Sequence, residues 1–167
     1  MTTISFKGNP IHTVGTLPTI GNQAPDFTVT KTDLSDIKLQ DVLGKKIVIS
    51  MFPSADTPTC AQAMRHFNEE ANKLDNVIVL CVSADLPFAL KRFCAAENLA
   101  NIIPTSVFRH PEFGTKFGVT IQDGPLAGLL SRAVMILDEK GKVVYTQQVP
   151  ELSNEPDYQA VLNELQK

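Results

Sequence analysis

Three cysteines, Cys60, Cys81 and Cys94, are the side chains best suited to nucleophilic or redox chemistry, and Cys60 has the most informative surroundings. It follows an apolar run at residues 47–52 that is short, β-rich and ended by Pro53, as expected of a buried strand. Beyond a short loop, apolar side chains recur at positions 60, 64, 67, 71 and 74, the spacing of one helix face. The sequence therefore places a thiol where a strand gives way to a helix.

The first turn of that helix favours a negatively charged sulfur. Thr57 suits the N-cap and Pro58 the first helical position, which puts Cys60 within the first turn. Unpaired backbone N–H groups and the positive end of the helix dipole stabilise an anion there, and the thiolate is the reactive form of cysteine. Because the helix end contributes only about 0.3–2 kcal/mol, we expect a cation or direct hydrogen bonds to complete the site.

Arg132 is the candidate cation. It immediately precedes a predicted strand at 133–137. In a thioredoxin-like sheet that strand is antiparallel to the one before Cys60, so it begins at the sheet edge where Cys60 lies. The hydroxyl of Thr57 has two roles open to it, as the helix cap or as a donor to the thiolate or a bound oxygen. His66 lies about 240° around the helix from Cys60 and should point elsewhere.

The other two cysteines receive different predictions. Cys94 lies on a second predicted helix, residues 87–98, for which Asp85 is the expected cap. A disulfide from Cys94 to the first-turn cysteine needs Cα atoms within about 7 Å, so we expect local unwinding if Cys94 acts as a resolving thiol. Cys81 lies in the middle of a predicted buried strand, residues 77–83, and is expected to be an inert core residue.

The order of elements predicts an α/β chain with a thioredoxin-like fold, in which a central mixed sheet is flanked by helices. From residue 47 we expect strand, helix, strand, helix, an irregular stretch, two strands and a helix. Strand–helix–strand at this spacing implies a parallel pair with a right-handed crossover. Ser153 or Asn154 should cap the last helix.

The N-terminal residues predict an extension to this fold. Residues 4–6 and 11–14 read as two short strands around Gly8-Asn9-Pro10, which indicates a β-hairpin. At 167 residues the chain is long enough for one core, so we expect a single domain over residues 1–167 with the hairpin at about 1–16.

Composition excludes several classes of function. The net charge is −3 without a basic block, which argues against nucleic acid and anionic membranes as partners. Apolar runs of about six residues are too short to span a bilayer, and no secretion signal is recognisable, so we expect a cytoplasmic protein. An odd, low cysteine count without C-x-x-C argues against a disulfide framework, and three scattered histidines give no zinc spacing.

The pattern Pro53-x-x-x-Thr57-x-x-Cys60 resembles the peroxidatic motif of the peroxiredoxins. Over nearly the whole chain, further segments resemble the bacterial thiol peroxidase subfamily, an atypical two-cysteine group. These segments are Pro53-Ser54-Ala55-Asp56-Thr57-Pro58-Thr59-Cys60, Ser83-Ala84-Asp85-Leu86-Pro87-Phe88-Ala89, Arg92-Phe93-Cys94, Gly124-Pro125-Leu126, Arg132-Ala133-Val134 and Glu155-Pro156-Asp157-Tyr158.

The resemblance implies a role for each candidate residue. Cys60 would be the peroxidatic cysteine and Cys94 the resolving cysteine, joined after oxidation by an intramolecular Cys60–Cys94 disulfide. Pro53 would shield the site, Thr57 would hydrogen-bond sulfur and peroxide, and Arg132 would steady the thiolate and the O–O bond.

The resemblance also implies the reaction and its partners. Members of the subfamily are homodimeric thiol peroxidases of antioxidant defence that reduce hydrogen peroxide and, preferentially, organic (alkyl) hydroperoxides, and thioredoxin restores their thiols. No metal, haem, flavin or other cofactor is required. The chain departs from the subfamily pattern at Ser131, where alanine is common, and at residues 104–107, one wall of the substrate site.

Three other functions would use some of the same residues. A non-catalytic redox relay would use the same cysteine pair, but it would be oxidised once rather than turn over a hydroperoxide. A thioredoxin-fold disulfide oxidoreductase is disfavoured by the missing C-x-x-C, and a metal carrier by the lack of further ligands near Cys60.

Overall fold

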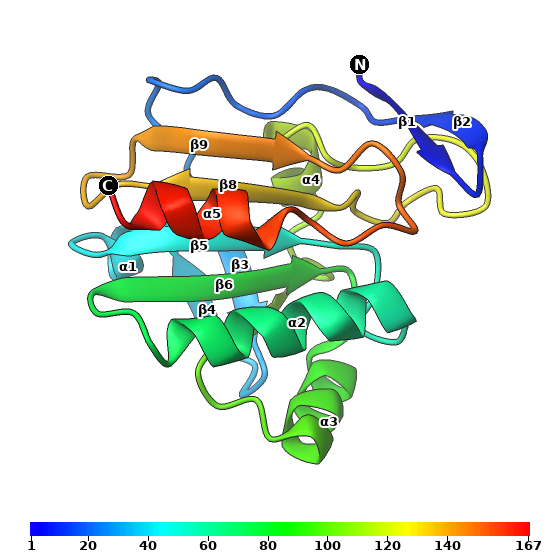
Figure 1. The fold of residues 1–167 in the computed structure, drawn as a ribbon. Coiled ribbons are helices and arrows are strands. Elements are labelled where there is room, and N and C mark those ends of the chain that lie inside the picture. The colour runs from blue at the N-terminus through cyan, green and yellow to red at the C-terminus, as the bar shows by residue number, and fades with distance from the viewer.

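A central seven-stranded sheet organises the computed structural model, which describes residues 1–167 (Figure 1). Its strand order is β4-β3-β7-β6-β5-β8-β9. The strands are β3 (Thr28–Lys31), β4 (Asp36–Lys38), β5 (Lys46–Met51), β6 (Val77–Ser83), β7 (Ile103–Ser106), β8 (Ala133–Leu137) and β9 (Val143–Gln148). The predicted thioredoxin-like fold with a mixed sheet is confirmed. The parallel part is larger than the predicted pair, because β7 runs parallel to β6 as β6 does to β5.

Five helices and a separate hairpin complete the fold. The helices are α1 (Leu39–Val42), α2 (Pro58–Ala71), α3 (Pro87–Glu97), α4 (Glu112–Lys116) and α5 (Tyr158–Leu165), and the hairpin pairs β1 (Thr3–Phe6) with β2 (Asn9–His12). In Figure 1, α2 and α5 cross the front of the sheet and α4 lies behind it. No helix is both long and apolar enough to span a lipid bilayer.

Alternation along the central strands produces two apolar layers, one on each face of the sheet. On β5, Ile47 and Ile49 face the layer that contains the phenylalanine of α4, whereas Val48 faces the layer beneath α2, α3 and α5. Cys60 and Cys81 are buried in this second layer. The candidate site therefore sits on the face covered by the longer helices.

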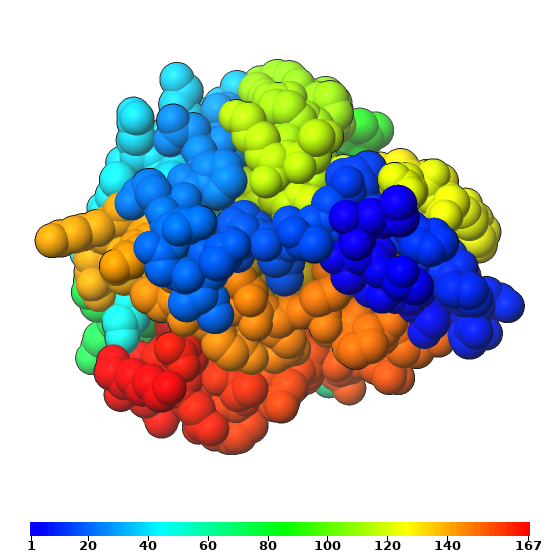
Figure 2. Space-filling view, turned by 90° about the horizontal axis from the view of Figure 1, so that it is seen from above, coloured from blue at the N-terminus to red at the C-terminus, as the bar shows by residue number.

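The hairpin turns at Lys7-Gly8 rather than at the predicted Gly8-Asn9-Pro10. Both turn residues have positive φ, 51° and 83°, as a two-residue type I′ turn requires, and Asn9 pairs with Phe6. Isolated bridges at Thr13 and Ser5 attach the hairpin to the body of the chain. Seen from above, the dark blue hairpin lies against the yellow loop that follows α4 (Figure 2).

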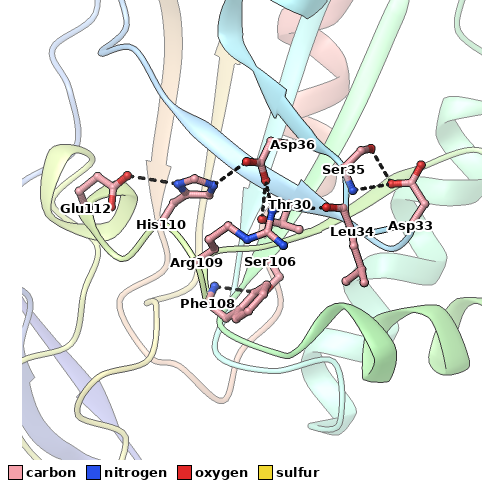
Figure 3. Close-up of polar contacts among 10 residues, drawn as sticks. All are labelled: Thr30, Asp33, Leu34, Ser35, Asp36, Ser106, Phe108, Arg109, His110 and Glu112. Carbon is pink, nitrogen blue, oxygen red and sulfur yellow. Dashed lines mark hydrogen bonds and ion pairs between the residues drawn. The ribbon is translucent and has the colours of Figure 1, made fainter.

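A polar cluster ties the β3–β4 hairpin to the segment after β7 (Figure 3). Asp36 accepts hydrogen bonds from Thr30 Oγ1 at 2.8 Å and Arg109 Nη1 at 3.1 Å. His110 lies between two carboxylates, 3.2 Å from Asp36 and 3.5 Å from Glu112. Burial opposes the charge of Asp36, but the contacts with Thr30, His110 and Arg109 outweigh it and hold its pKa below the usual range. This cluster stabilises the sheet edge remote from β8.

Two predicted caps are wrong. The side chain of Asp157, rather than Ser153 or Asn154, caps α5 by accepting a hydrogen bond from Ala160 N at 3.1 Å. Helix α3 begins after Leu86 without a side-chain cap, so Asp85 does not cap it. Sequence patterns could not separate these cases, because several residues able to cap a helix precede each one.

The Asp85 carboxylate instead joins the loops that follow β5 and β6. Oδ1 accepts from Ser54 Oγ at 2.6 Å, and Oδ2 accepts from Ala55 N at 2.8 Å and Ser83 Oγ at 2.7 Å. The Asp85 carbonyl also accepts a hydrogen bond from Ser106 Oγ on β7. One acidic side chain thus fixes the loop that leads into α2 to the loop that leads into α3.

Replacing Asp85 by alanine should destabilise the chain, because three donors lose their acceptor. Partly buried donors left unpaired cost about 2–3 kcal/mol together, which lowers Tm by about 4–10 °C for a chain of this size. Differential scanning calorimetry should show this loss, whereas Asp56→Ala, in the same loop but with an exposed side chain that makes no hydrogen bond, should change Tm by less than about 2 °C. Equal Tm values for the two variants would contradict the bridging role of Asp85.

Candidate active site

The site begins where β5 passes into α2. The backbone of Phe52 extends the pairing with β6 by a hydrogen bond to Val82 O at 3.1 Å, and the chain then turns through the 53–57 loop. Thr57 caps α2, with Oγ1 accepting from Cys60 N at 3.3 Å. Cys60 therefore occupies the first turn of the helix, as the sequence predicts, and its side chain is fully buried.

Arg132 lies directly against this sulfur. Because β8 is antiparallel to β5, with Ala133 paired to Met51, the residue before β8 falls beside the loop that follows β5. Arg132 Nη1 donates to Cys60 Sγ at 3.1 Å. The other edge of the guanidinium is held by one main-chain carbonyl, Leu152 O, which accepts from Nε at 3.0 Å and from Nη2 at 2.8 Å.

The electrostatics of this contact favour an anionic sulfur. Arg132 is only 3% exposed and forms no ion pair with any carboxylate. A buried cation is costly unless a negative charge compensates it. Cys60 is the ionisable group in hydrogen-bond contact with Arg132, so a thiolate there would neutralise the guanidinium, while Leu152 O accepts hydrogen bonds from Nε and Nη2.

The structure uses the Thr57 hydroxyl for the helix cap. Its oxygen accepts from Cys60 N, and its hydrogen is directed to Ser54 O at 3.0 Å. A hydroxyl carries one hydrogen, so donation from Thr57 to sulfur or to a bound oxygen requires the bond to Ser54 to break. Of the two roles open to Thr57, the cap is the one formed here.

A cavity of about 260 Å³ opens beside Arg132, the residue in contact with the sulfur. Pro53, Thr57 and Arg132 contribute to its wall, together with side chains from the N-terminal hairpin and from the loops before β8 and α5. Cys60 itself does not line this cavity and has no exposed surface. A small molecule in the cavity thus meets the guanidinium and the loop first, and it reaches the sulfur only after a local movement of this wall.

Cys94 forms no disulfide with Cys60 in this structure, because all three cysteines are free thiols. It lies half-buried on α3 and packs against the apolar layer that also contains Cys60 and Cys81. Burial raises the pKa of Cys94 to about 11, so the thiol is protonated at neutral pH. Cys81 is wholly buried in β6, and burial raises its pKa further, which fits the predicted core position.

Two groups around the site received no role from sequence reasoning. Leu152 acts through its main-chain carbonyl, which any residue would provide, so no side-chain pattern could have identified it. Tyr158 is recognisable in the sequence only at the end of a family-like segment, without a role of its own. Its ring stacks on His66 with centroids 3.8 Å apart, and its hydroxyl donates to Glu155 at 2.9 Å. Burial, then Glu155, raises the pKa of Tyr158.

The chain matches one family model and resembles two thiol peroxidases over nearly its whole length. The redoxin family model matches residues 19–162 of the chain. Thiol peroxidases of Mycobacterium tuberculosis (strain H37Rv) and Mycobacterium bovis are each 50% identical over 162 residues, which cover 97% of this chain and 97% of the relative.

Solved structures agree with this relationship. A peroxiredoxin-like protein from Aquifex aeolicus superposes with a TM-score of 0.94 at 41% identity, covering 99% of this chain and 96% of that one. A thiol peroxidase from Chromobacterium violaceum, at 22% identity, shares the fold with a TM-score of 0.91, covering 98% and 95%. The chain therefore belongs to the redoxin family and is a thiol peroxidase of the peroxiredoxin type.

Proposed function

We propose that the chain reduces hydrogen peroxide and alkyl hydroperoxides through Cys60 as the peroxidatic nucleophile and Cys94 as the resolving thiol. The observation that carries the proposal is the 3.1 Å contact between Cys60 Sγ and a buried Arg132 guanidinium that has no carboxylate partner. This contact supports a thiolate in the first turn of α2, which is the form that attacks peroxides.

In the first step the Cys60 thiolate attacks the terminal peroxide oxygen. An S–O bond forms as the O–O bond breaks, sulfur is oxidised to a sulfenic acid, and the leaving alkoxide or hydroxide takes a proton to become alcohol or water. Arg132 Nη1, already aimed at this point, is placed to stabilise the charge that moves onto the leaving oxygen. The role of Pro53 is to cover the reacting atoms, which its position in the cavity wall supports.

In the second step Cys94 condenses with the sulfenic acid, releasing water and forming the Cys60–Cys94 disulfide. Both cysteines border the same apolar layer, but burial and helical structure separate the two thiols in the reduced chain. The first turn of α2 and the Cys94 segment of α3 must therefore open locally. An external dithiol of the thioredoxin type then restores both thiols by exchange.

The remaining parts of this proposal rest on the family resemblance. They are a homodimeric assembly, a cytoplasmic location, a single peroxiredoxin domain over residues 1–167 and a role in antioxidant defence. Neither reaction step draws on a metal or an organic cofactor.

Mass spectrometry of the intact chain tests the assignment of both cysteines. One equivalent of hydroperoxide should remove about 2 Da from the wild-type chain, and Cys94→Ser should instead gain about 16 Da on Cys60, as expected for a disulfide and a sulfenic acid. Cys81→Ala, a matched cysteine variant in the core, should keep the 2 Da loss. Sustained peroxidase turnover by Cys60→Ser would refute the proposal, and a single stoichiometric oxidation without turnover would favour a redox relay.

Replacing Arg132 by lysine should slow the reaction with peroxide although the charge is kept. A lysine ammonium cannot span Leu152 O and the sulfur as a planar guanidinium does. Loss of one donor aimed at a developing charge typically costs about 10²–10³-fold, so kcat/KM for hydrogen peroxide should fall by about that factor. Arg109→Lys, in the polar cluster at the other edge of the sheet, is the control and should leave kcat/KM within about twofold.

The raised pKa of Cys94 predicts a loss of stability in alkali. Burial raises the pKa of this thiol from 9.0 to about 11, so the folded chain binds the thiol proton more tightly than the unfolded chain does. The contribution of Cys94 is fully present below pH 9 and is lost as the pH rises from about 9 to about 11. As the pH rises from about 9 to about 11, the unfolding free energy of the wild type should therefore fall relative to that of Cys94→Ser. A constant difference would show that Cys94 is not buried in solution.

A further inference from the structure

We infer that Lys7 makes the cavity selective for anionic alkyl hydroperoxides, in which an apolar chain separates the hydroperoxide group from a carboxylate. This inference rests on the proposed function of the cavity beside Cys60 and adds a class of substrate to it. The reaction at sulfur is unchanged, and Lys7 acts on the far end of the substrate.

The first support is the size and lining of the cavity. Its volume of about 260 Å³ is many times the roughly 10–15 Å³ that a cavity needs to admit one water molecule, so it can hold more than hydrogen peroxide. Beyond the polar groups at the reacting end, its wall includes the apolar residues Phe6, Leu126 and Leu152. Phe6 and Leu126 pack against the small apolar cluster around Leu152, which fixes their positions. Such a wall suits an alkyl chain.

The second support is an unpaired cation on the same wall. Lys7 lines the cavity, and its ammonium lies 5.3 Å from the centroid of the Phe6 ring. Lys7 forms no ion pair with any Asp or Glu. Arg132, the other cation of the cavity, is already engaged by the sulfur and by Leu152 O. Lys7 is therefore the positive charge left available to a substrate.

The backbone holds Lys7 in this place. It occupies the first position of the two-residue turn, with φ of 51°, and the next residue, Gly8, donates its N–H to Glu151 Oε1 at 2.9 Å. Glu151 is the carboxylate nearest to the turn by these contacts, but it is occupied by Gly8 N and by Ser153 N at 3.3 Å rather than by the ammonium. The turn is thus fixed to the loop before α5, and Lys7 is presented to the cavity.

These observations favour an elongated substrate that carries a hydroperoxide at one end and a carboxylate at the other. The hydroperoxide lies toward Arg132 and the sulfur, the alkyl chain lies along Phe6 and Leu126, and the carboxylate meets Lys7. An uncharged ester of the same substrate packs against the same apolar wall but forms no ion pair with Lys7. The difference between acid and ester isolates the contribution of the ammonium.

The test compares an ω-hydroperoxy alkanoic acid of medium chain length with its methyl ester. At low ionic strength the wild type should show the higher kcat/KM for the acid, and Lys7→Met should lower the acid-to-ester ratio about threefold, the size of an exposed ion pair. Lys7→Arg should retain the ratio, and added salt should reduce it in the wild type. Lys45→Met, an exposed lysine before the start of β5 at the opposite end of the strand, is the matched control and should leave the ratio unchanged.

A second measurement does not depend on turnover. A peroxide-free alkanoate of the same length should slow alkylation of Cys60 by iodoacetamide more than its methyl ester does, and Lys7→Met should remove this difference. An unchanged acid-to-ester ratio in Lys7→Met, or equal protection by acid and ester, would overturn the inference while leaving the peroxidase intact. Loss of turnover with every hydroperoxide, with the protection by the acid retained, would instead overturn the proposed function and leave the anion subsite standing.

Discussion

The contact between Cys60 Sγ and the Arg132 guanidinium is the interaction on which the rest of the site depends. A cation buried inside a protein needs a negative charge close by, and here the sulfur is the group placed to supply it. The helix N-terminus alone stabilises an anion by at most about 2 kcal/mol. The structure adds a charged donor at hydrogen-bond distance from the sulfur, which would stabilise a thiolate further.

The fold supplies this contact through sheet topology rather than through sequence proximity. Antiparallel pairing of β5 with β8 brings the end of one strand beside the start of the other, although Cys60 and Arg132 are far apart in the chain. Asp85 joins the loop before α2 to the loop before α3, and Leu152 O holds the guanidinium of Arg132. The site is thus held by main-chain and side-chain hydrogen bonds that converge from four segments.

Much of this arrangement could be predicted from the sequence. The strand–loop–helix around Cys60 was recognisable from local periodicity and from the Thr57 cap, and the position of Arg132 followed from the expected strand direction. Leu152 could not be found, because a carbonyl oxygen has no residue signature. Asp85 was assigned to the wrong partner, since an acidic residue before a helix suits a cap as well as a tertiary bridge, and only the packing of the loops decides between them.

The burial of Arg132 has a consequence for the oxidised chain. In the proposed cycle the sulfur passes from an anion to a neutral sulfenic acid and then to a neutral disulfide. The guanidinium keeps its charge throughout, so each oxidation leaves it enclosed without compensation, a costly state. The same arginine that holds the reduced site closed therefore penalises the closed site once the peroxide has been consumed. Catalysis itself would loosen the first turn of α2, and reduction by a dithiol would close it again.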